Sequence, residues 1–454
     1  MKHLVRGCIV FVILLGLAFY SGCGTVEEED HSLWIFVDYY SERQVDKIAQ
    51  SFQQAHPDVP LRIEYVPRDA AERELYLEQL RTKIMAGQGP DVFLLDKYSE
   101  VFSDVEQSMY NGLFLDISTY YDEDTALEKD GFAQSIMDAG VVDGARYILP
   151  LYYNFPVLYV DTLQLASAGI SLNALGKGLS GLAEVMQKLG KTAVLTDYGQ
   201  LEYYYLQNFF GELIDCETQK VTWSKSQLVE FLCQYRELLI LTEGEYMPWF
   251  DVGIYNYISD EKHLGQDGSC IYWGTLYDLV DIVRISKVTD REIAIFPMTA
   301  YDGSVCAQIS HLGAIGANTG KPELAYEFLQ AFALEECQWE VANGSNSLLN
   351  ENWPVLVKNS WVQLDDEIWK GKMAACRAGS RRAAVAATTV SAEDYAILNT
   401  EISKAYLPLA CADEFMMTIR QQLNPYLNPD AASVDVEALA DQLIGQLQWL
   451  VAEG

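Results

Sequence analysis

The feature that most constrains the fold is an alternation of short apolar runs with amphipathic segments near the amino terminus. Apolar runs rich in β-forming residues begin at Leu33, Leu61 and Pro90. The segments between them carry apolar residues at helical spacing, and Ser41 provides an amino-terminal cap for the first of them. This β-α-β-α-β order predicts a parallel sheet with helices on both faces.

The same alternation continues through most of the chain and favours a large α/β protein. The chain has 454 residues, half of them hydrophobic, which is ample for extensive buried cores. No internal repeat and no long low-complexity linker divides it, and the sequence becomes mainly helical after Trp353. Lobes that share several crossovers therefore fit this sequence better than a row of independent domains.

The amino-terminal segment has the composition of a secretion signal. Residues 1–22 contain no acidic residue, and an apolar run between Cys8 and Tyr20 follows two basic residues. The run is shorter than the roughly 18 to 20 apolar residues that a permanent transmembrane anchor needs. The Ser-Gly-Cys sequence that ends at Cys23 resembles a bacterial lipobox, although Tyr20 stands where Leu is usual. The resemblance implies lipidation of Cys23, with residues 23–32 as a tether.

The charge of the chain excludes several classes of partner. It contains 31 Lys and Arg residues against 65 Asp and Glu residues, which gives a formal net charge of -34. Nucleic acids and other polyanions are bound by Lys and Arg that displace counterions, so a nucleic-acid function is excluded. Neutral and cationic ligands remain open.

No pattern in the sequence predicts a metal site or a cofactor. The cysteines outside the signal and Cys23 are scattered and odd in number, and the histidines lie far apart, so we expect buried free thiols and no metal. Gly176, Gly178 and Gly181 match the G-x-G-x-x-G pattern of dinucleotide sites. The residues before them do not form a convincing strand, so a loop at the start of a helix is favoured.

Several segments in a fixed order resemble the extracellular solute-binding proteins of carbohydrate-type ABC importers, the maltose-binding-protein-like family. They include "LRTKIMAGQGPDVFLLD", "NGLFLDISTYY", "DGARYILPLYYNFPVLYVDTLQLASAGI" and "LGAIGANTGKPELAYEFLQAFALEECQ". The resemblance implies an α/β periplasmic-binding-protein-like fold of two lobes, each a mixed sheet flanked by helices, joined by several crossovers. We expect one lobe from residues 33–150 plus 300–350, and the other from residues 155–296 plus 355–454.

The candidate ligand-binding residues are polar and aromatic side chains at strand ends and at the expected hinge, where open α/β sheets bind ligands. Each has a structural alternative, because tyrosines can cover a lobe surface and tryptophans can fill a core. We expect Asp96, Tyr153 and Trp273 to line one cleft. The full set comprises Asp38, Tyr39, Tyr40, Asp96, Tyr153, Asn154, Trp249, Trp273 and Tyr277.

The resemblance implies a monomeric, lipid-anchored receptor on the extracellular face of a bacterial membrane, without catalytic activity. It would capture a mono- or oligosaccharide and deliver it to the permease subunits of an ABC importer. The 28 Tyr and 9 Trp suit stacking on sugars, but peptides or polyamines also bind to aromatic rings. Two alternatives stay open. A secreted carbohydrate-processing enzyme needs a carboxyl pair about 5 to 9 Å apart, and a sensing lipoprotein of the same fold would lack transport.

Overall fold

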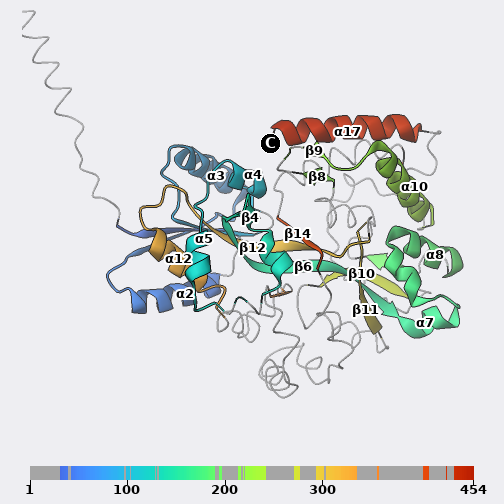
Figure 1. Ribbon diagram of the computed structural model, residues 1–454, viewed down its shortest axis with the longest axis horizontal. Helices are drawn as coiled ribbons and strands as arrows, with labels where there is room; N and C mark the ends of the chain where they lie inside the picture. Colours follow the sequence, from blue (N-terminus) through green and yellow to red (C-terminus); the bar gives the residue numbers. More distant parts are fainter. Residues whose placement is uncertain are drawn as a thin grey trace, which may run out of the picture.

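The computed structural model arranges the chain in two groups of helices and strands that two long strands connect (Figure 1). One group contains α2, α3, α5 and α12, and the other contains α7, α8, α10 and α17. The residues that the structure describes are 31–38, 42–96, 99–102, 104–127, 129, 132–189, 194–196, 213–215, 218, 220–241, 270–276, 293–300, 303–334, 355–356, 402–407, 426 and 434–453.

The first lobe is built on three parallel strands with β1 in the centre. Strand β1 pairs with β2 on one side and with β3 on the other, and every residue of β1 and β3 is buried. The Asp69 carboxylate starts α3 by accepting hydrogen bonds from the backbone N–H groups of Ala71 and Glu72. The β-α-β-α-β prediction is confirmed by β1 (Leu33–Val37), α2 (Glu42–Ala55), β2 (Leu61–Tyr65), α3 (Ala70–Met85) and β3 (Val92–Asp96).

Strands β6 (Ile148–Asp161) and β12 (Cys306–Ile315) carry the chain between the lobes. Strand β12 pairs antiparallel with β3 along one edge and with the first half of β6 along the other. The second half of β6 pairs antiparallel with β10 (Ile271–Leu276) on one edge and with β11 (Ile293–Pro297) on the other. Because all 14 residues of β6 are buried, this strand is a shared core element of both lobes.

In the second lobe, helices surround β10, β11 and β7 (Val194–Thr196). Strand β7 runs parallel to β10. Helix α10 packs against α8 and also against the carboxyl-terminal helix α17. Helices distant in sequence therefore share one core. The helices of this lobe are α7 (Thr162–Ser167), α8 (Leu179–Leu189), α10 (Lys225–Leu241) and α17 (Val436–Glu453).

Two hydrophobic clusters divide the core between the lobes. The first includes Phe36, Phe93 and Phe328, and the second includes Trp273 and Phe231. Strand β6 contributes to both, which fits the predicted two-lobed α/β fold. At the junction, β13 (Val355–Leu356) pairs with β6, and β14 (Lys404–Tyr406) pairs with β12.

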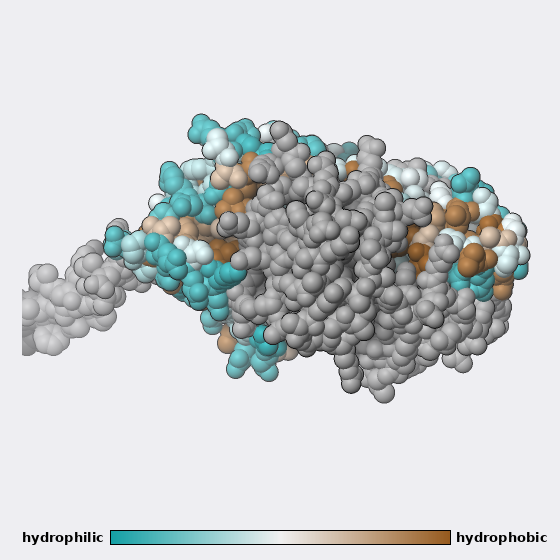
Figure 2. Space-filling model, turned by 90° about the horizontal axis from the view of Figure 1, so that it is seen from below, coloured by the Kyte–Doolittle hydropathy of each residue, from teal (hydrophilic) through white to brown (hydrophobic). Residues whose placement is uncertain are grey.

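Short elements complete the described part of the molecule. Figure 2 shows that hydrophilic residues cover much of the first lobe on the face seen from below. No helix within the described ranges is long and apolar enough to cross a membrane.

The remaining elements are α4 (Val105–Tyr110), α5 (Ser118–Glu123), α6 (Gln134–Asp138), β4 (Val141–Val142), β5 (Ala145–Arg146), η2 (Leu172–Lys177), β8 (Ile214–Asp215), β9 (Lys220–Val221) and α12 (Pro322–Gln330).

Candidate functional site

The parallel strands of the first lobe end close to the junction with the second lobe. Asp96, the last residue of β3, lies opposite His311 of β12, and His311 lies opposite Tyr152 of β6. Asp38 follows β1 directly, and its backbone N–H donates to the Leu94 carbonyl at 2.9 Å. Both acidic residues therefore lie near the level at which β6 leaves the first lobe.

The strands of the second lobe end at the same junction from the other side. Strand β10 ends at Leu276, opposite Phe155, and β11 ends at Pro297, opposite Val157. Carboxyl ends of strands from both lobes thus converge on the middle of β6, around Asn154. Open α/β sheets bind ligands at such ends, so this junction is the candidate site.

Asp38 is a buried acid in this region. Its side chain is 1% exposed, and within the described residues neither carboxylate oxygen has a hydrogen-bond partner. Burial raises the pKa of Asp38 to about 6. The nearby Ser99 hydroxyl, a hydrogen-bond donor to the charged form, and the charge of Arg73 oppose the rise, whereas the charge of Glu100 adds to it. A buried polar group without a partner is uncommon in folded proteins, so Asp38 is a strong candidate to contact a ligand.

Asn154 shares this property at the middle of β6. It is 0% exposed, and neither its amide nitrogen nor its amide oxygen has a hydrogen-bond partner in the part of the chain that is described. Tyr153 is the preceding residue, so the two side chains leave the strand on opposite faces. The Tyr153 ring stacks on Phe155 with centroids 6.5 Å apart, and burial raises the pKa of Tyr153. Tyr153 and Asn154 therefore do not present a common surface.

Trp273 lies in the core of the second lobe. It is fully buried, belongs to the second hydrophobic cluster and lies opposite Leu158 of β6. Tyr153 belongs to the first cluster, and Asp96 is a buried acid at the end of β3. A cleft shared by Asp96, Tyr153 and Trp273 remains a prediction. The predicted residues Tyr39, Tyr40, Trp249 and Tyr277, and the lipidation residue Cys23, lie outside the described residues.

Thr299 is a further buried polar residue near the junction, and the sequence analysis missed it. It is 9% exposed, and its hydroxyl has no hydrogen-bond partner among the residues described. It follows β11 by two residues, next to Met298, whose N–H donates to the Pro156 carbonyl at 2.9 Å. The signal available in the sequence was its position just after the apolar run that forms β11.

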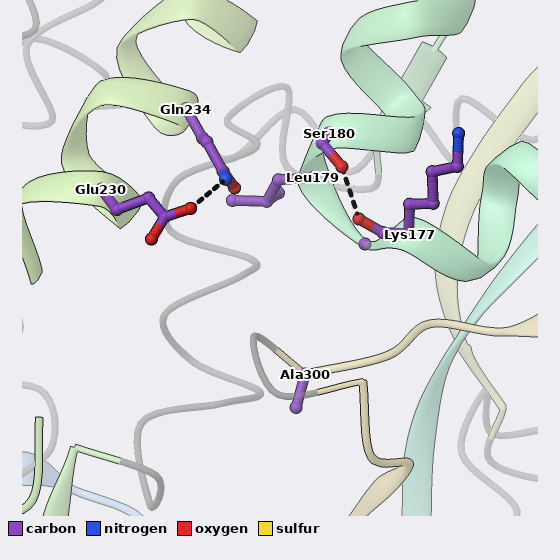
Figure 3. Close-up of a pocket in the computed structure, with 7 residues that line it drawn as sticks. Lys177, Leu179, Ser180, Glu230, Gln234 and Ala300 are labelled. Atoms are coloured by element: carbon purple, nitrogen blue, oxygen red, sulfur yellow. Dashed lines mark hydrogen bonds between the residues drawn. The ribbon is translucent and has the colours of Figure 1, made fainter. Parts of the chain in front are cut away.

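A cavity of about 240 Å³ lies within the second lobe (Figure 3). Gln234 donates to the Glu230 carboxylate at 3.5 Å, and the Ser180 hydroxyl donates to the Lys177 carbonyl at 2.9 Å. The Lys177 amine extends away from Glu230 and Gln234. The cavity is lined by Lys177, Gly178, Leu179, Ser180, Glu230, Gln234 and Ala300.

The glycine-rich sequence beside this cavity lacks the setting of a dinucleotide site. The motif begins within the 3-10 helix η2, where a dinucleotide site would have a strand. Gly178, with a φ of 59°, separates η2 from α8. The sequence interpretation of a loop at a helix start agrees with this geometry. Among the described residues, no group of three or more His, Cys, Asp or Glu side chains could hold a metal ion.

The chain is similar to known bacterial solute-binding proteins in sequence and in fold. The family model described as bacterial extracellular solute-binding protein matches residues 39–220. The sugar-binding protein MalE from Xanthomonas citri superposes with a TM-score of 0.62 at 14% identity, covering 93% of this chain and 98% of that chain. The cyclic α-maltosyl-1,6-maltose binding protein from Arthrobacter globiformis gives 0.59 at 14% identity, covering 93% and 100%.

A third solved structure has the same fold. An extracellular solute-binding protein family 1 member from Alicyclobacillus acidocaldarius gives a TM-score of 0.57 at 19% identity, covering 92% of this chain and 98% of that chain. No curated protein sequence matches the chain. The family match and the shared two-lobed fold confirm the resemblance to the bacterial extracellular solute-binding proteins that the sequence segments predicted.

Proposed function

We propose that this protein is an extracellular receptor that binds a mono- or oligosaccharide between its two lobes, without catalysing a reaction. The observation that carries the proposal is that Asp38 and Asn154, both buried at the junction of the lobes, have no hydrogen-bond partner for their side chains among the residues that the structure describes. A carboxylate accepts hydrogen bonds and an amide both donates and accepts them, which suits the hydroxyl groups of a sugar. The matched structures named for sugar or maltosyl ligands support the same class of solute.

The two lobes close on the solute by bending the strands that join them. Residues up to Asn154 of β6 pair with β12, whereas residues from Phe155 onward pair with β10 and β11. The change of partner at this point makes residues 154 and 155 the natural place for a hinge. A solute that contacts both lobes stabilises the closed form over the open form, because it makes more contacts in the closed form. The lobes comprise residues 33–150 plus 300–350 and residues 155–296 plus 355–454.

The amino-terminal sequence supports a place for this receptor at the outer surface of the cell membrane. Lipid on Cys23 would hold the monomeric receptor there through the tether of residues 23–32. From this position the receptor would deliver its solute to the permease subunits of an ABC importer. Mass spectrometry of the membrane-extracted protein should find Cys23 as the lipid-bearing amino terminus. A mature chain that retains residues 1–22 would contradict the anchor.

A thermal-shift screen of the chain from residue 24 onward tests the binding function. The panel contains sugars, sugar alcohols, amino acids and polyamines. A solute present at 100 times its dissociation constant adds about 2.7 kcal/mol to the free energy of unfolding, which shifts the melting temperature measurably. Stabilisation by a sugar, and its loss in the Asn154→Ala variant, is the expected result. Stabilisation only by amino acids or polyamines would overturn the sugar assignment.

A further inference from the structure

The charged groups and the tyrosine nearest Asp38 are engaged with other partners, and the nearby Ser99 hydroxyl only partly opposes the effect of burial on this carboxyl group. On α3, the Arg73 guanidinium lies 3.5 Å from the Glu100 carboxylate, which faces it from the segment after β3. The Tyr76 hydroxyl of the same helix donates to the Glu64 carboxylate of β2 at 2.8 Å. The nearby cation is therefore paired with a different acid, and the Tyr76 hydroxyl donates to another carboxylate.

An ionised carboxylate in this position is costly. Removing a charge from water without giving it a hydrogen-bond donor strongly disfavours the charged form. Two events can relieve this cost: the carboxyl group can take up a proton, or a donor from outside the protein can bind to it. Because Asp38 follows β1 at the edge where the lobes meet, a bound solute is placed to provide that donor.

We propose that the solute supplies the missing hydrogen-bond donor to Asp38 and that its binding is coupled to loss of the Asp38 proton. This inference rests on the solute-binding function proposed above. When the solute binds, the carboxyl O–H bond breaks and its proton passes to water. A hydroxyl or ammonium group of the solute then donates to the carboxylate oxygen. No other bond changes.

The pH dependence of solute affinity follows from the protonation of Asp38 in the ligand-free protein. Burial raises the pKa of Asp38 to about 6 before the solute binds. A donor that binds the ionised form lowers this pKa, so the solute and the proton compete for the same group. Affinity therefore falls as the pH drops below 6, by about tenfold per pH unit when one proton is displaced.

The groups that face Asp38 allow this behaviour to be attributed to a single residue. They are Arg73 and Tyr76 from α3, Ser99 and Glu100 from the segment after β3 and, through Tyr76, Glu64 from β2. Burial raises the pKa of Tyr76, so this hydroxyl stays protonated between pH 5 and 7. Tyr39, Tyr40 and Lys97, which adjoin these segments in sequence, lie outside the described residues.

A ligand-free titration tests the proton itself. Proton uptake between pH 7.5 and 4.5 is compared among the wild-type chain, the Asp38→Asn variant and the Asp58→Asn variant. Asp58 is an exposed acid in a turn and serves as the matched control. Wild type and Asp58→Asn should share one uptake step near pH 6 that Asp38→Asn lacks. If wild type and a folded Asp38→Asn variant have the same uptake curve, the proposal is overturned. Asp38→Ser provides a second variant if the asparagine variant does not fold.

Calorimetry with glucose and glucosamine at pH 5, 6 and 7 tests the coupling. In wild type, binding should be about tenfold weaker at pH 5 than at pH 7, and it should release close to one proton at pH 5. In Asp38→Asn, the affinity should not change with pH. The same pH dependence in both proteins would refute the coupling.

The two sugars also identify the donor. Tighter binding of glucosamine than of glucose assigns an ammonium group, whereas equal affinity assigns a hydroxyl. If neither sugar binds at any pH, the sugar that stabilises the protein in the thermal-shift screen replaces them, and a screen in which no sugar stabilises the protein counts against the sugar function. The titration still decides whether Asp38 holds a proton, so the two failures are distinguishable.

Discussion

The Thr319 hydroxyl donates a hydrogen bond of 2.6 Å to the Asp91 carboxylate, across 228 residues of sequence. The other Asp91 oxygen accepts a hydrogen bond from the backbone N–H of Trp34 at 2.8 Å. Nearby, the Lys321 amine donates to the Ser32 carbonyl at 2.6 Å. These bonds join the start of β1, the start of β3 and the turn after β12. One buried acid thus connects the amino-terminal strand to the returning segment of the first lobe.

Replacing Asp91 with alanine should destabilise the first lobe. The change leaves the Trp34 N–H and the Thr319 hydroxyl without their acceptor in a buried position. We expect the free energy of unfolding to fall by about 2 to 3 kcal/mol, measured by urea denaturation. Thr319→Val leaves the Trp34 bond intact but removes the bond to Asp91 and the acceptor of the Lys321 backbone N–H, and should cost about 1 to 2 kcal/mol. Equal stability of Asp91→Ala and wild type would show that this connection does not contribute.

Two glycines of the same motif should respond differently to alanine. A Cβ on Gly181 would lie 1.9 Å from the Ala174 carbonyl oxygen, whereas a Cβ on Gly176 would meet no atom within 4 Å. Gly181→Ala should therefore cost about 1 to 3 kcal/mol through backbone displacement, and Gly176→Ala should change stability by less than about 0.5 kcal/mol. Thermal unfolding of the two variants tests this contrast. Equal losses would argue against close packing of η2 on α8.

The stability contributed by Asp38 should depend on pH. An isolated aspartate has a pKa of about 4, whereas burial raises the pKa of Asp38 to about 6 in the folded protein. The folded state therefore binds the proton more tightly, so this contribution is complete below pH 4 and is lost as the pH rises through 6. Between pH 4 and pH 7.5, the free energy of unfolding of Asp38→Asn should rise by up to about 3 kcal/mol relative to that of wild type. Urea unfolding of both proteins at several pH values measures the difference, and parallel curves would contradict it.

The first lobe was predictable because its local pattern and its tertiary role agree. The apolar runs at Leu33 and Pro90 are buried on both faces, as a central parallel strand requires. Strand β6, which lies in one of the segments that resemble the solute-binding family, passes between the lobes. In these segments, each local preference points to the same fold.

The candidate site was less predictable because it depends on which face of a strand meets which cluster. The alternation of side chains places Tyr272 and Trp273 on opposite faces of β10, but it does not assign the faces. In the structure, Tyr272 joins the first cluster and Trp273 joins the second. Likewise, no sequence pattern reveals that the side chains of Asn154 and Thr299 lack hydrogen-bond partners among the described residues, since this depends on segments distant in sequence.

Because Trp273 is buried in a core, we expect its removal to lower the stability of the protein. Its side chain fills the second hydrophobic cluster and is fully buried. Trp273→Ala should therefore lower the free energy of unfolding by about 3 to 5 kcal/mol, as is usual for a large aromatic residue removed from a core. Chemical denaturation measures this loss. Trp223→Ala, another tryptophan of the same cluster, is the matched comparison. A stable Trp273→Ala protein with weakened solute binding would instead support the predicted place of Trp273 in the cleft.

Asn154 should show the opposite behaviour, because within the described part of the chain its side-chain amide forms no hydrogen bond that a substitution would remove. Asn154→Ala should keep the free energy of unfolding within about 1 kcal/mol of wild type, since it removes a buried polar group without a partner. If the amide binds the solute, the same variant should lose about 1 to 3 kcal/mol of binding free energy, which is roughly a 5- to 150-fold weaker affinity. Calorimetry with the sugar that stabilises wild type measures the affinity, and urea denaturation measures the stability. Gln308, which lies opposite Asn154 on β12, provides the control variant Gln308→Ala on the neighbouring strand. A large loss of stability with unchanged affinity in Asn154→Ala would show that this residue supports the junction of the lobes and does not contact the solute.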